Sequence, residues 1–423
     1  MHVLIINTSE RTGGAAIAAN RLMEALKKNG IKARMLVRDK QTDQLTVSSI
    51  PSSWTLTVKF LWERFIIWIN NRLSRKNLLM VDIANTGTDI TQTFEFKQAD
   101  VIHLHWVNHG YLSLHDIDLI MQSGKPVVIT MHDMWYFTGI CHHAGKCEKY
   151  KVQCVECPLI YGGIGKDLAQ QVFLQKRKIY YNNKIVFVGC SQWMASLCRS
   201  SRLTSGQTIL NIPNPIDTAT FQPADMQESR KDCHLPADKY LLLFCSRLIT
   251  DPYKGFRQLA DACSIIRKQY PQLAERLGVV VLGEESDKIK SLIPLDVYPV
   301  NYLSNLRDIV RLYNAVDLFV TPSLQENLPN TIMEAMACGT PCVGFHIGGI
   351  PEMIDHQQNG YVANYRDAED FARGIDWCLS PEHYPALCTS ARQKVLDNYS
   401  EERVAHRYTE VYELAKELLQ PNA

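Results

Sequence analysis

Short aliphatic runs alternate with longer amphipathic segments in the first half of the chain. A helical pattern covers residues 15–30, and strand-like runs lie at residues 2–7, 32–37, 100–107, 126–131 and 184–191. Aliphatic and β-branched runs separated by helix-length segments are typical of βαβ units that build a parallel sheet. The sequence therefore predicts an α/β domain in this half.

The second half repeats the alternation. Strand-like runs lie at residues 240–248, 278–283, 317–323 and 340–345, with helical patterns at 256–270, 306–316 and 330–339. Between the halves, residues 211–223 contain three prolines, which disfavour both helix and central strand. Because 423 residues exceed what one core usually supports, we predict two doubly wound, Rossmann-like domains at residues 1–215 and 216–396.

Residues 397–423 predict a final amphipathic helix. Ser400 is a suitable N-cap residue, and apolar side chains follow at helical spacing at Val404, Tyr408, Val411, Tyr412 and Leu414. A helix with such a stripe must bury it against another element. We expect it to pack back across the two domains.

The composition excludes several classes of protein. Lys and Arg number 45 against 44 Asp and Glu, so the overall field does not favour nucleic acid. Most of the 13 cysteines are scattered through apolar segments, as in a reducing compartment. The first apolar run is too short for a signal peptide, and none approaches the about 20 residues that span a bilayer. We expect a cytoplasmic protein.

Polar loops repeatedly follow the predicted strands. In open parallel sheets, ligands bind beyond the carboxyl ends of the strands. The loops at those ends are residues 9–14, 107–110, 132–133, 246–255 and 324–330. If the two domains face one another, these loops line a cleft between them, where we expect the active site.

Residues 322–345 are the most informative segment. Pro329 suits the first turn of a helix that ends near Cys338, and Gly339 is a natural residue just past its end. Glu326 then lies in the preceding loop and Glu334 on the second turn. Unbonded amides at the start of such a helix form an anion site suited to a diphosphate.

The run PSLQENLPNTIMEAMACGTP closely resembles the signature of the family-4 retaining glycosyltransferases, which have the GT-B fold. The resemblance implies transfer of a sugar from a nucleotide diphosphate donor. It assigns Glu326 to hydroxyls of the transferred sugar and Glu334 to the ribose, tasks that suit carboxylates. Asn327 and Leu328 would also lie against the donor.

Three further segments are similar to this family. Arg247 and Lys254 match its Arg and Lys contacts to the donor phosphates, although the loop between them carries an insertion. Fixed cations there would stabilise charge on the departing diphosphate. Gly13-Gly14 resembles the glycine-rich turn near the donor phosphate, and His132 resembles the histidine near the transferred sugar.

Two histidine interpretations stay open. His132 fits either a catalytic role or a structural one in which it satisfies buried carbonyls. His103 and His105 lie on one face of a strand and fit either an acceptor pocket or the core.

The resemblance implies front-face attack with retention, in which the departing phosphate oxygen takes the acceptor proton. No cofactor is implied for catalysis, and we interpret the Asp-x-Asp at residues 116–118 as a solvated helix start. A saccharide or lipid-linked saccharide of polysaccharide biosynthesis is the expected acceptor.

Alternatives of other classes are a GT-B nucleotide-sugar epimerase and a non-catalytic nucleotide-sugar binding protein. A nicotinamide dehydrogenase is disfavoured because the dinucleotide fingerprint is absent. The donor base, the sugar and the linkage are not specified by these motifs.

Residues 54–76 predict a helix with one apolar face. That face comprises Trp54, Val58, Leu61, Trp62, Phe65 and Ile69, and five basic residues, Lys59, Arg64, Arg72, Arg75 and Lys76, outnumber Glu63. Peripheral contact with an anionic membrane, at the inner face of the cell membrane, is one interpretation. A core-facing helix with a basic solvent side is the other.

Four cysteines cluster at Cys141, Cys147, Cys154 and Cys157. The closing C-x-x-C has zinc-ligand spacing, so a structural Cys₄ zinc site is the favoured interpretation, with His142 or His143 as a substitute ligand. Two disulfides are the alternative.

Overall fold

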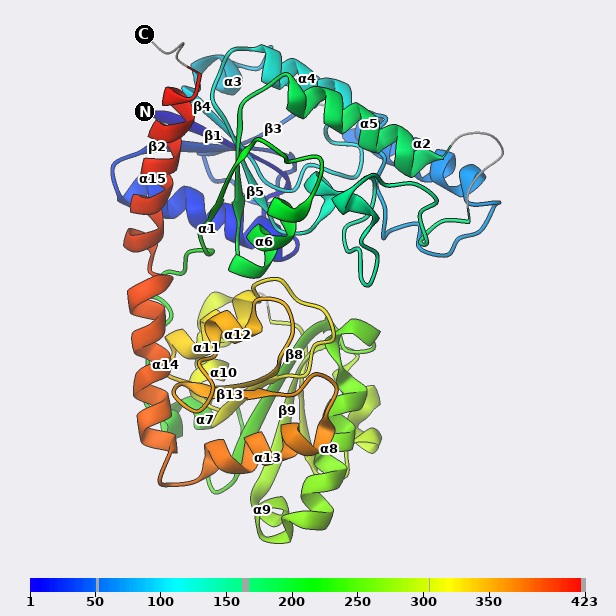
Figure 1. Ribbon diagram of the computed structural model, residues 1–423. Helices are drawn as coiled ribbons and strands as arrows, with labels where there is room; N and C mark the ends of the chain where they lie inside the picture. The colour runs from blue at the N-terminus through cyan, green and yellow to red at the C-terminus, as the bar shows by residue number, and fades with distance from the viewer. Residues whose placement is uncertain (51–52, 162–166, 304, 420–423) are drawn as a thin grey trace. The chain divides into compact units, whose positions relative to one another are not determined.

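The computed structural model describes residues 1–50, 53–161, 167–303 and 305–419. These divide into two compact units (Figure 1). The first unit comprises residues 1–215 and 404–423, and the second unit comprises residues 216–403. Each unit is built around its own parallel sheet.

The first unit contains a seven-stranded sheet of order β3-β2-β1-β4-β5-β6-β7, in which all neighbours are parallel. Its strands are β1 His2–Ser9, β2 Lys32–Asp39, β3 Val47–Ser49, β4 Val101–Leu104, β5 Val127–Met131, β6 Ile185–Gly189 and β7 Thr208–Asn211. Its helices are α1 Gly14–Lys28, α2 Ser53–Asn70, α3 Phe94–Gln98, α4 Leu114–Gln122, α5 Leu168–Tyr181, α6 Gln192–Ser200 and α15 Glu401–Glu417, with short 3₁₀ turns at Trp135–Phe137 and Lys149–Lys151.

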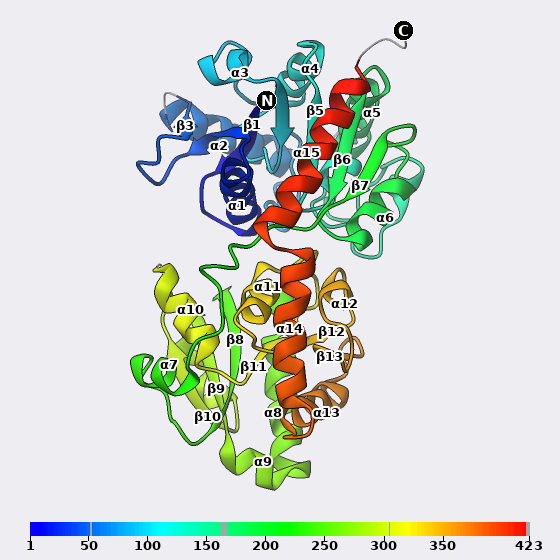
Figure 2. The ribbon, with the colours of Figure 1, turned by 90° about the vertical axis from the view of Figure 1, so that its left-hand side faces the viewer.

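Helices cover both faces of this sheet. One core joins alternate residues of β1, such as Val3 and Ile5, to the apolar sides of α1 and α15. The opposite core joins Leu4 and Ile6 to α2, α4 and α5. Figure 2 shows α15 lying along the sheet of this unit. The alternation along β1 is what a strand buried on both faces requires.

The second unit contains a six-stranded parallel sheet of order β10-β9-β8-β11-β12-β13. Its strands are β8 Tyr240–Leu248, β9 Leu277–Glu284, β10 Asp296–Val300, β11 Leu318–Thr321, β12 Cys342–Phe345 and β13 Gly360–Ala363. Its helices are α7 Met226–Asp232, α8 Phe256–Gln269, α9 Pro271–Arg276, α10 Leu306–Asn314, α11 Asn330–Ala337, α12 Ile350–Met353, α13 Ala368–Leu379 and α14 Tyr384–Asn398, with 3₁₀ turns at Pro252–Lys254 and Ser286–Leu292.

The predicted α/β class is confirmed, and each strand-like run named from the sequence contains a strand. The short or edge strands β3, β7, β10 and β13 were missed because their apolar runs are brief. The apolar stripe of α15 is buried, including Val404, Tyr408, Val411 and Tyr412. These residues pack on the sheet of the first unit.

One expectation about helices was wrong, and one of the two interpretations of residues 54–76 is excluded. Asp116 does begin a helix, but it is buried rather than solvated, because it closes a capping box with Ser113 at the start of α4. The apolar face of α2 does not point to the core: Leu61, Trp62 and Phe65 are about half exposed. Among the described residues, no helix is long and apolar enough to cross a membrane.

Candidate functional site

In the second unit, the loops after β8 and β11 meet at the carboxyl ends of the strands. The amide of Leu324 donates to the carbonyl oxygen of Tyr253 at 2.7 Å, which ties the two loops together. Gly255 has φ of 76°, and a Cβ there would lie 1.7 Å from the carbonyl oxygen of Pro322. Only glycine permits this close approach.

That approach brings Lys254 and Glu326 into an ion pair. The hydroxyl of Ser323 donates to Glu326 Oε1 at 3.2 Å. Burial lowers the pKa of Lys254, but the adjacent Glu326 outweighs burial and holds that pKa above its ordinary value. The Lys254 side chain stays 36% exposed, so an incoming anion can reach the ammonium group.

Glu334 lies on the second turn of α11, as predicted, and it is buried. The hydroxyl of Tyr313 donates to Glu334 Oε2 at 2.8 Å, which fixes the carboxylate. Asn327 and Leu328 lie in the loop that enters α11, and the carbonyl oxygen of Asn327 accepts from the amide of Gly349 at 2.8 Å. The first turn of α11 therefore starts beside Glu326.

Arg247 is not part of this ion pair. Its side chain is 72% exposed, and its Nε lies 3.6 Å from Glu284 Oε1 at the end of β9. The inserted residues of the loop separate it from Lys254.

In the first unit, the turn after β1 leads into α1 through two exposed glycines. Gly13 has φ of 92°, and no side chain caps the first turn of α1. The buried carboxylate of Glu10 anchors the turn by accepting from the backbone amides of Gln41 at 2.6 Å and Thr42 at 2.9 Å. The first turn of α1 contains no acidic residue.

His132 follows β5 and lies in a row of histidines. Its Nε2 is 2.9 Å from His105 Nδ1. Burial lowers the pKa of His132 to about 4, so the imidazole is neutral. His103 is fully buried, and its ring nitrogens contact Thr130 at 2.7 Å and Tyr412 at 2.9 Å. His103 therefore belongs to the core.

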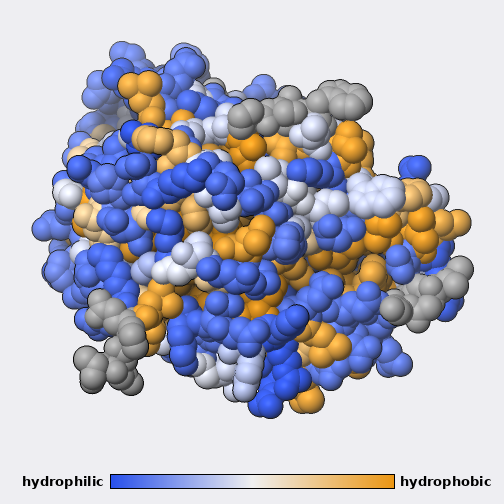
Figure 3. Space-filling model, turned by 90° about the horizontal axis from the view of Figure 1, so that it is seen from above, coloured by the Kyte–Doolittle hydropathy of each residue, from blue (hydrophilic) through white to orange (hydrophobic). Residues whose placement is uncertain are grey.

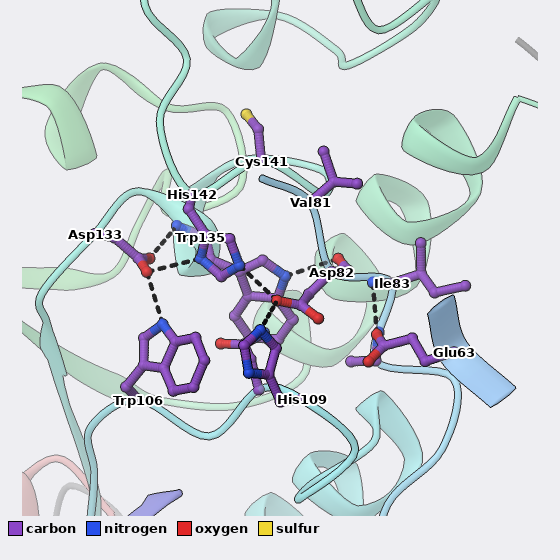
Figure 4. A network of polar contacts seen from close by, with 12 residues as sticks. Glu63, Val81, Asp82, Ile83, Trp106, His109, Asp133, Trp135, Cys141 and His142 are labelled. Carbon is purple, nitrogen blue, oxygen red and sulfur yellow. Dashed lines mark hydrogen bonds and ion pairs between the residues drawn. The ribbon is translucent and has the colours of Figure 1, made fainter. Parts of the chain in front are cut away.

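A charged network that we did not predict from the sequence lies around Asp82, Asp133 and His142 (Figure 4). His142 bridges two carboxylates, with Nδ1 at 2.7 Å from Asp133 and Nε2 at 2.5 Å from Asp82. Trp106 donates to the same Asp133 oxygen at 2.8 Å. Arg64 pairs with Asp82 from the other side. The network joins α2, the segment after it, and the loops after β4 and β5.

The pKa values within the network follow from these contacts. Burial favours neutral His142, but Asp133 and Asp82 outweigh burial and raise its pKa to about 10. Burial would raise the pKa of Asp133, yet His142 brings it down to about 2. At neutral pH the network therefore holds an imidazolium between two carboxylates. Adjacent charged residues inside the apolar run of α2, Glu63 and Arg64, are the one sequence signal that pointed to it.

Asn108, in the loop after β4, is 2% exposed, and neither its Oδ1 nor its Nδ2 has a hydrogen-bond partner. Its carbonyl oxygen accepts from the Thr8 hydroxyl at 3.0 Å, which places the residue beside the end of β1. A buried amide without partners is costly unless a ligand or water satisfies it.

The predicted zinc site is not supported. In the part of the chain that the structure describes, no three His, Cys, Asp or Glu residues are placed to hold a metal. Cys141, Cys147, Cys154 and Cys157 are free thiols that line one small apolar cavity, so the disulfide alternative is not seen either. Burial raises the pKa of Cys141 to about 12, which disfavours the thiolate that zinc requires. The Cys154 sulfur instead accepts from the Gly139 amide at 3.2 Å.

Comparison with known proteins agrees with these features. Residues 239–381 match the family described as glycosyl transferases group 1. The D-inositol 3-phosphate glycosyltransferase of Saccharomonospora viridis is 29% identical over 209 residues, or 47% of this chain and 48% of that protein. The N-acetyl-alpha-D-glucosaminyl L-malate synthase of Bacillus anthracis is 26% identical over 209 residues, which is 49% of this chain and 53% of that protein. The chain spans about half the length of the curated relatives it matches.

Solved structures show the same fold. Anabaena HepE, crystallised with UDP and glucose, matches with a TM-score of 0.64 at 16% identity, covering 98% of this chain and 100% of that one. The two parallel sheets, together with this similarity to HepE, identify the fold as the GT-B class. Residues 239–381 therefore match the group 1 glycosyltransferases, and the fold of the chain is that of the GT-B class.

Proposed function

We propose that this protein transfers a sugar, with retention of configuration, from a nucleotide diphosphate sugar to a saccharide or lipid-linked saccharide acceptor. We place the reaction in polysaccharide biosynthesis, in the cytoplasm at the inner face of the cell membrane. The observation that carries the proposal is the Lys254–Glu326 ion pair beside the first turn of α11 in the second unit.

The second unit would bind the donor. Lys254 is a fixed cation that a diphosphate can reach, and it would stabilise the charge that grows as the sugar leaves. Glu326 would then be released from Lys254 to accept hydrogen bonds from sugar hydroxyls. Glu334, which Tyr313 already orients, would accept from the ribose hydroxyls. Arg247 would add a second cation only if its exposed side chain leaves Glu284.

The first unit would bind the acceptor. Its Gly13-Gly14 turn would present the backbone amides at the start of α1 to the donor phosphate. His132 would act near the transferred sugar as a neutral imidazole, which can accept a proton or donate a hydrogen bond. The unpartnered amide of Asn108 has the donors and acceptors that pair with a sugar hydroxyl.

The relatives and solved structures support a nucleotide-sugar donor. Anabaena HepE was crystallised with UDP-glucose. The S. viridis relative is named a D-inositol 3-phosphate glycosyltransferase, and the B. anthracis relative is named an N-acetyl-alpha-D-glucosaminyl L-malate synthase. We expect donor recognition in the second unit to resemble theirs, because the family match lies there.

A donor screen tests the proposal. Purified protein is incubated with UDP-, GDP- and ADP-sugars and a panel of saccharide and lipid-linked acceptors, and released nucleoside diphosphate is measured. We expect release that depends on acceptor, with the product anomer matching the donor by NMR. Epimerised donor without transfer would identify an epimerase. Binding without turnover on every acceptor would favour a nucleotide-sugar binding protein.

A further inference from the structure

The helix α2 turns its apolar stripe away from the protein. Val58, Leu61, Trp62, Phe65 and Ile69 are 40% to 57% exposed, although they lie at the spacing of a core-facing stripe. Trp54 was predicted on the same face, but its side chain lies outside the described residues. The stripe continues past the helix to Leu73, which is 58% exposed.

Polar contacts on the opposite side fix this orientation. Glu63 Oε1 accepts from the amides of Ile83 at 2.9 Å and Ala84 at 2.7 Å. Arg64 donates to the carbonyl oxygen of Val81 at 2.9 Å and pairs with Asp82. Glu63 and Arg64 are buried while the apolar residues are exposed. Rotating the stripe inward would break every one of these contacts, so its exposure is built into the fold.

The exposed residues form a continuous surface rather than scattered positions. The rings of Trp62 and Phe65 lie 5.8 Å apart, and those of Phe65 and Trp68 lie 6.1 Å apart. In Figure 3, apolar side chains gather on the right-hand side of the first unit, where α2 lies in Figure 1. A contiguous apolar surface of this kind marks an interaction site.

The charges next to this surface indicate what covers it. Arg72, Arg75 and Lys76 follow α2 and are exposed. Within the described ranges, no ion pair involves any of the three. The only acidic residue of α2 is Glu63, which is turned inward. An apolar stripe beside uncompensated cations is complementary to an anionic lipid surface.

We propose that the exposed face of α2, together with Arg72, Arg75 and Lys76, docks the protein on an anionic bilayer. Trp62 and Phe65 enter the interfacial region, and the three cations lie at the level of the lipid phosphates. A second copy of the chain would bring like cations together, which favours lipid over self-association. The inference shares the membrane location with the proposed function but does not depend on sugar transfer.

Vesicle binding tests the proposal. The full chain is sedimented with vesicles of phosphatidylcholine alone or mixed with phosphatidylglycerol, at low and high salt. We expect binding only to the anionic vesicles, a blue shift of tryptophan fluorescence, and weaker binding at high salt because salt screens the cations. The double variant W62S/F65S and the triple variant R72E/R75E/K76E should each bind at least about tenfold more weakly, because both kinds of contact contribute.

Matched controls make the outcome decisive. The variant L292S/Y302S removes two exposed apolar residues of the second unit and should bind vesicles like the native protein. Unchanged thermal unfolding would show that the α2 variants fold. Equal vesicle binding by native and α2-variant proteins, or none by either, would overturn the proposal. A native dimer that W62S/F65S converts to a monomer without lipid would assign the surface to a second copy instead. Calorimetric titration with UDP tests donor binding separately, so failure of the proposed function is distinguishable.

Discussion

The two units hold ion pairs of different character, and each pair includes residues from loops that follow parallel strands. In the second unit, Lys254 and Glu326 form a single pair whose cation is about one-third exposed. In the first unit, His142 is almost enclosed between Asp82 and Asp133, and Asp82 is fully buried. An open pair can exchange its partner for a ligand. Exchanging a partner of the enclosed triad for a ligand would leave a buried charge uncompensated. The triad therefore holds segments of the chain together instead of binding a ligand.

The largest expected effect tests the enclosed triad. His142→Gln removes the imidazolium and leaves Asp82 and Asp133 buried near one another, so unfolding free energy should fall by about 3–5 kcal/mol. Urea unfolding followed by tryptophan fluorescence measures it. His406→Gln, an exposed histidine, is the control and should change little. Native-like stability of His142→Gln would show that the triad is not structural.

The triad also predicts how stability depends on pH. The pKa of His142 is raised to about 10 from 6.5, so its contribution is fully present below pH 6.5 and is lost as pH rises toward 10. The neighbouring charged groups are Asp82, Asp133 and Arg64, while burial lowers the pKa of His109 to about 4 and raises the pKa of Glu63 to about 7. The stability difference between native protein and His142→Gln should therefore shrink across this range. A difference that is constant from pH 6 to about 10 would contradict the assignment of a protonated His142.

A substitution of Lys254 tests the role of the partly exposed Lys254–Glu326 ion pair. Lys254→Ala should lower transfer about 10- to 100-fold, equal to about 1.5–3 kcal/mol, because one charge-assisted contact to the diphosphate is lost. Stability should change little, since the side chain is partly solvated. Lys288→Ala, at another exposed lysine of the second unit that pairs with Glu285, is the matched control for the rate. Near-native turnover of Lys254→Ala would place the diphosphate elsewhere.

A substitution of Asn108 distinguishes a ligand-binding role of this residue from a structural role. Asn108→Ala removes an amide that has no internal partner, so stability should stay unchanged or rise slightly. If the amide binds the acceptor, KM for the acceptor should rise about tenfold, or by about 1.4 kcal/mol, while donor affinity is unaffected. Lower stability with unchanged acceptor KM would make Asn108 a structural residue.

Glu334 should give the smallest effect. Glu334→Gln keeps the shape and the hydrogen-bond acceptor but loses the charge, so donor affinity should fall by about 1 kcal/mol or roughly fivefold. Isothermal titration calorimetry with the preferred nucleoside diphosphate measures it. The exposed Glu382→Gln is the control. An unchanged affinity would remove Glu334 from the ribose site.

Much of the donor-side geometry could be inferred from local patterns. Pro329 and Gly339 bound α11 in the sequence because proline and glycine restrict or permit particular backbone angles. Those limits place Glu326 before the helix and Glu334 on it. The alternation of strands and helices likewise follows from periodicity, which depends only on near neighbours.

The cysteine cluster and α2 show where such inference fails. Zinc-ligand spacing was present, yet the thiols line a small apolar cavity, where burial raises the pKa of Cys141 to about 12. Burial depends on residues far along the chain, which spacing does not report. The apolar stripe of α2 resembles that of α15. One is exposed and the other is buried because Glu63 and Arg64 find partners at residues 81–84.

Local chemistry thus specifies the class of fold, the bounds of α11 and the loops that carry the predicted ligand-binding residues. The pairing of Lys254 with Glu326, the bridging of Asp82 and Asp133 by His142, and the outward face of α2 depend on contacts between segments 9 to 72 residues apart. Electrostatic pairing and burial are properties of three-dimensional neighbours. No periodicity along the chain encodes which neighbours those are.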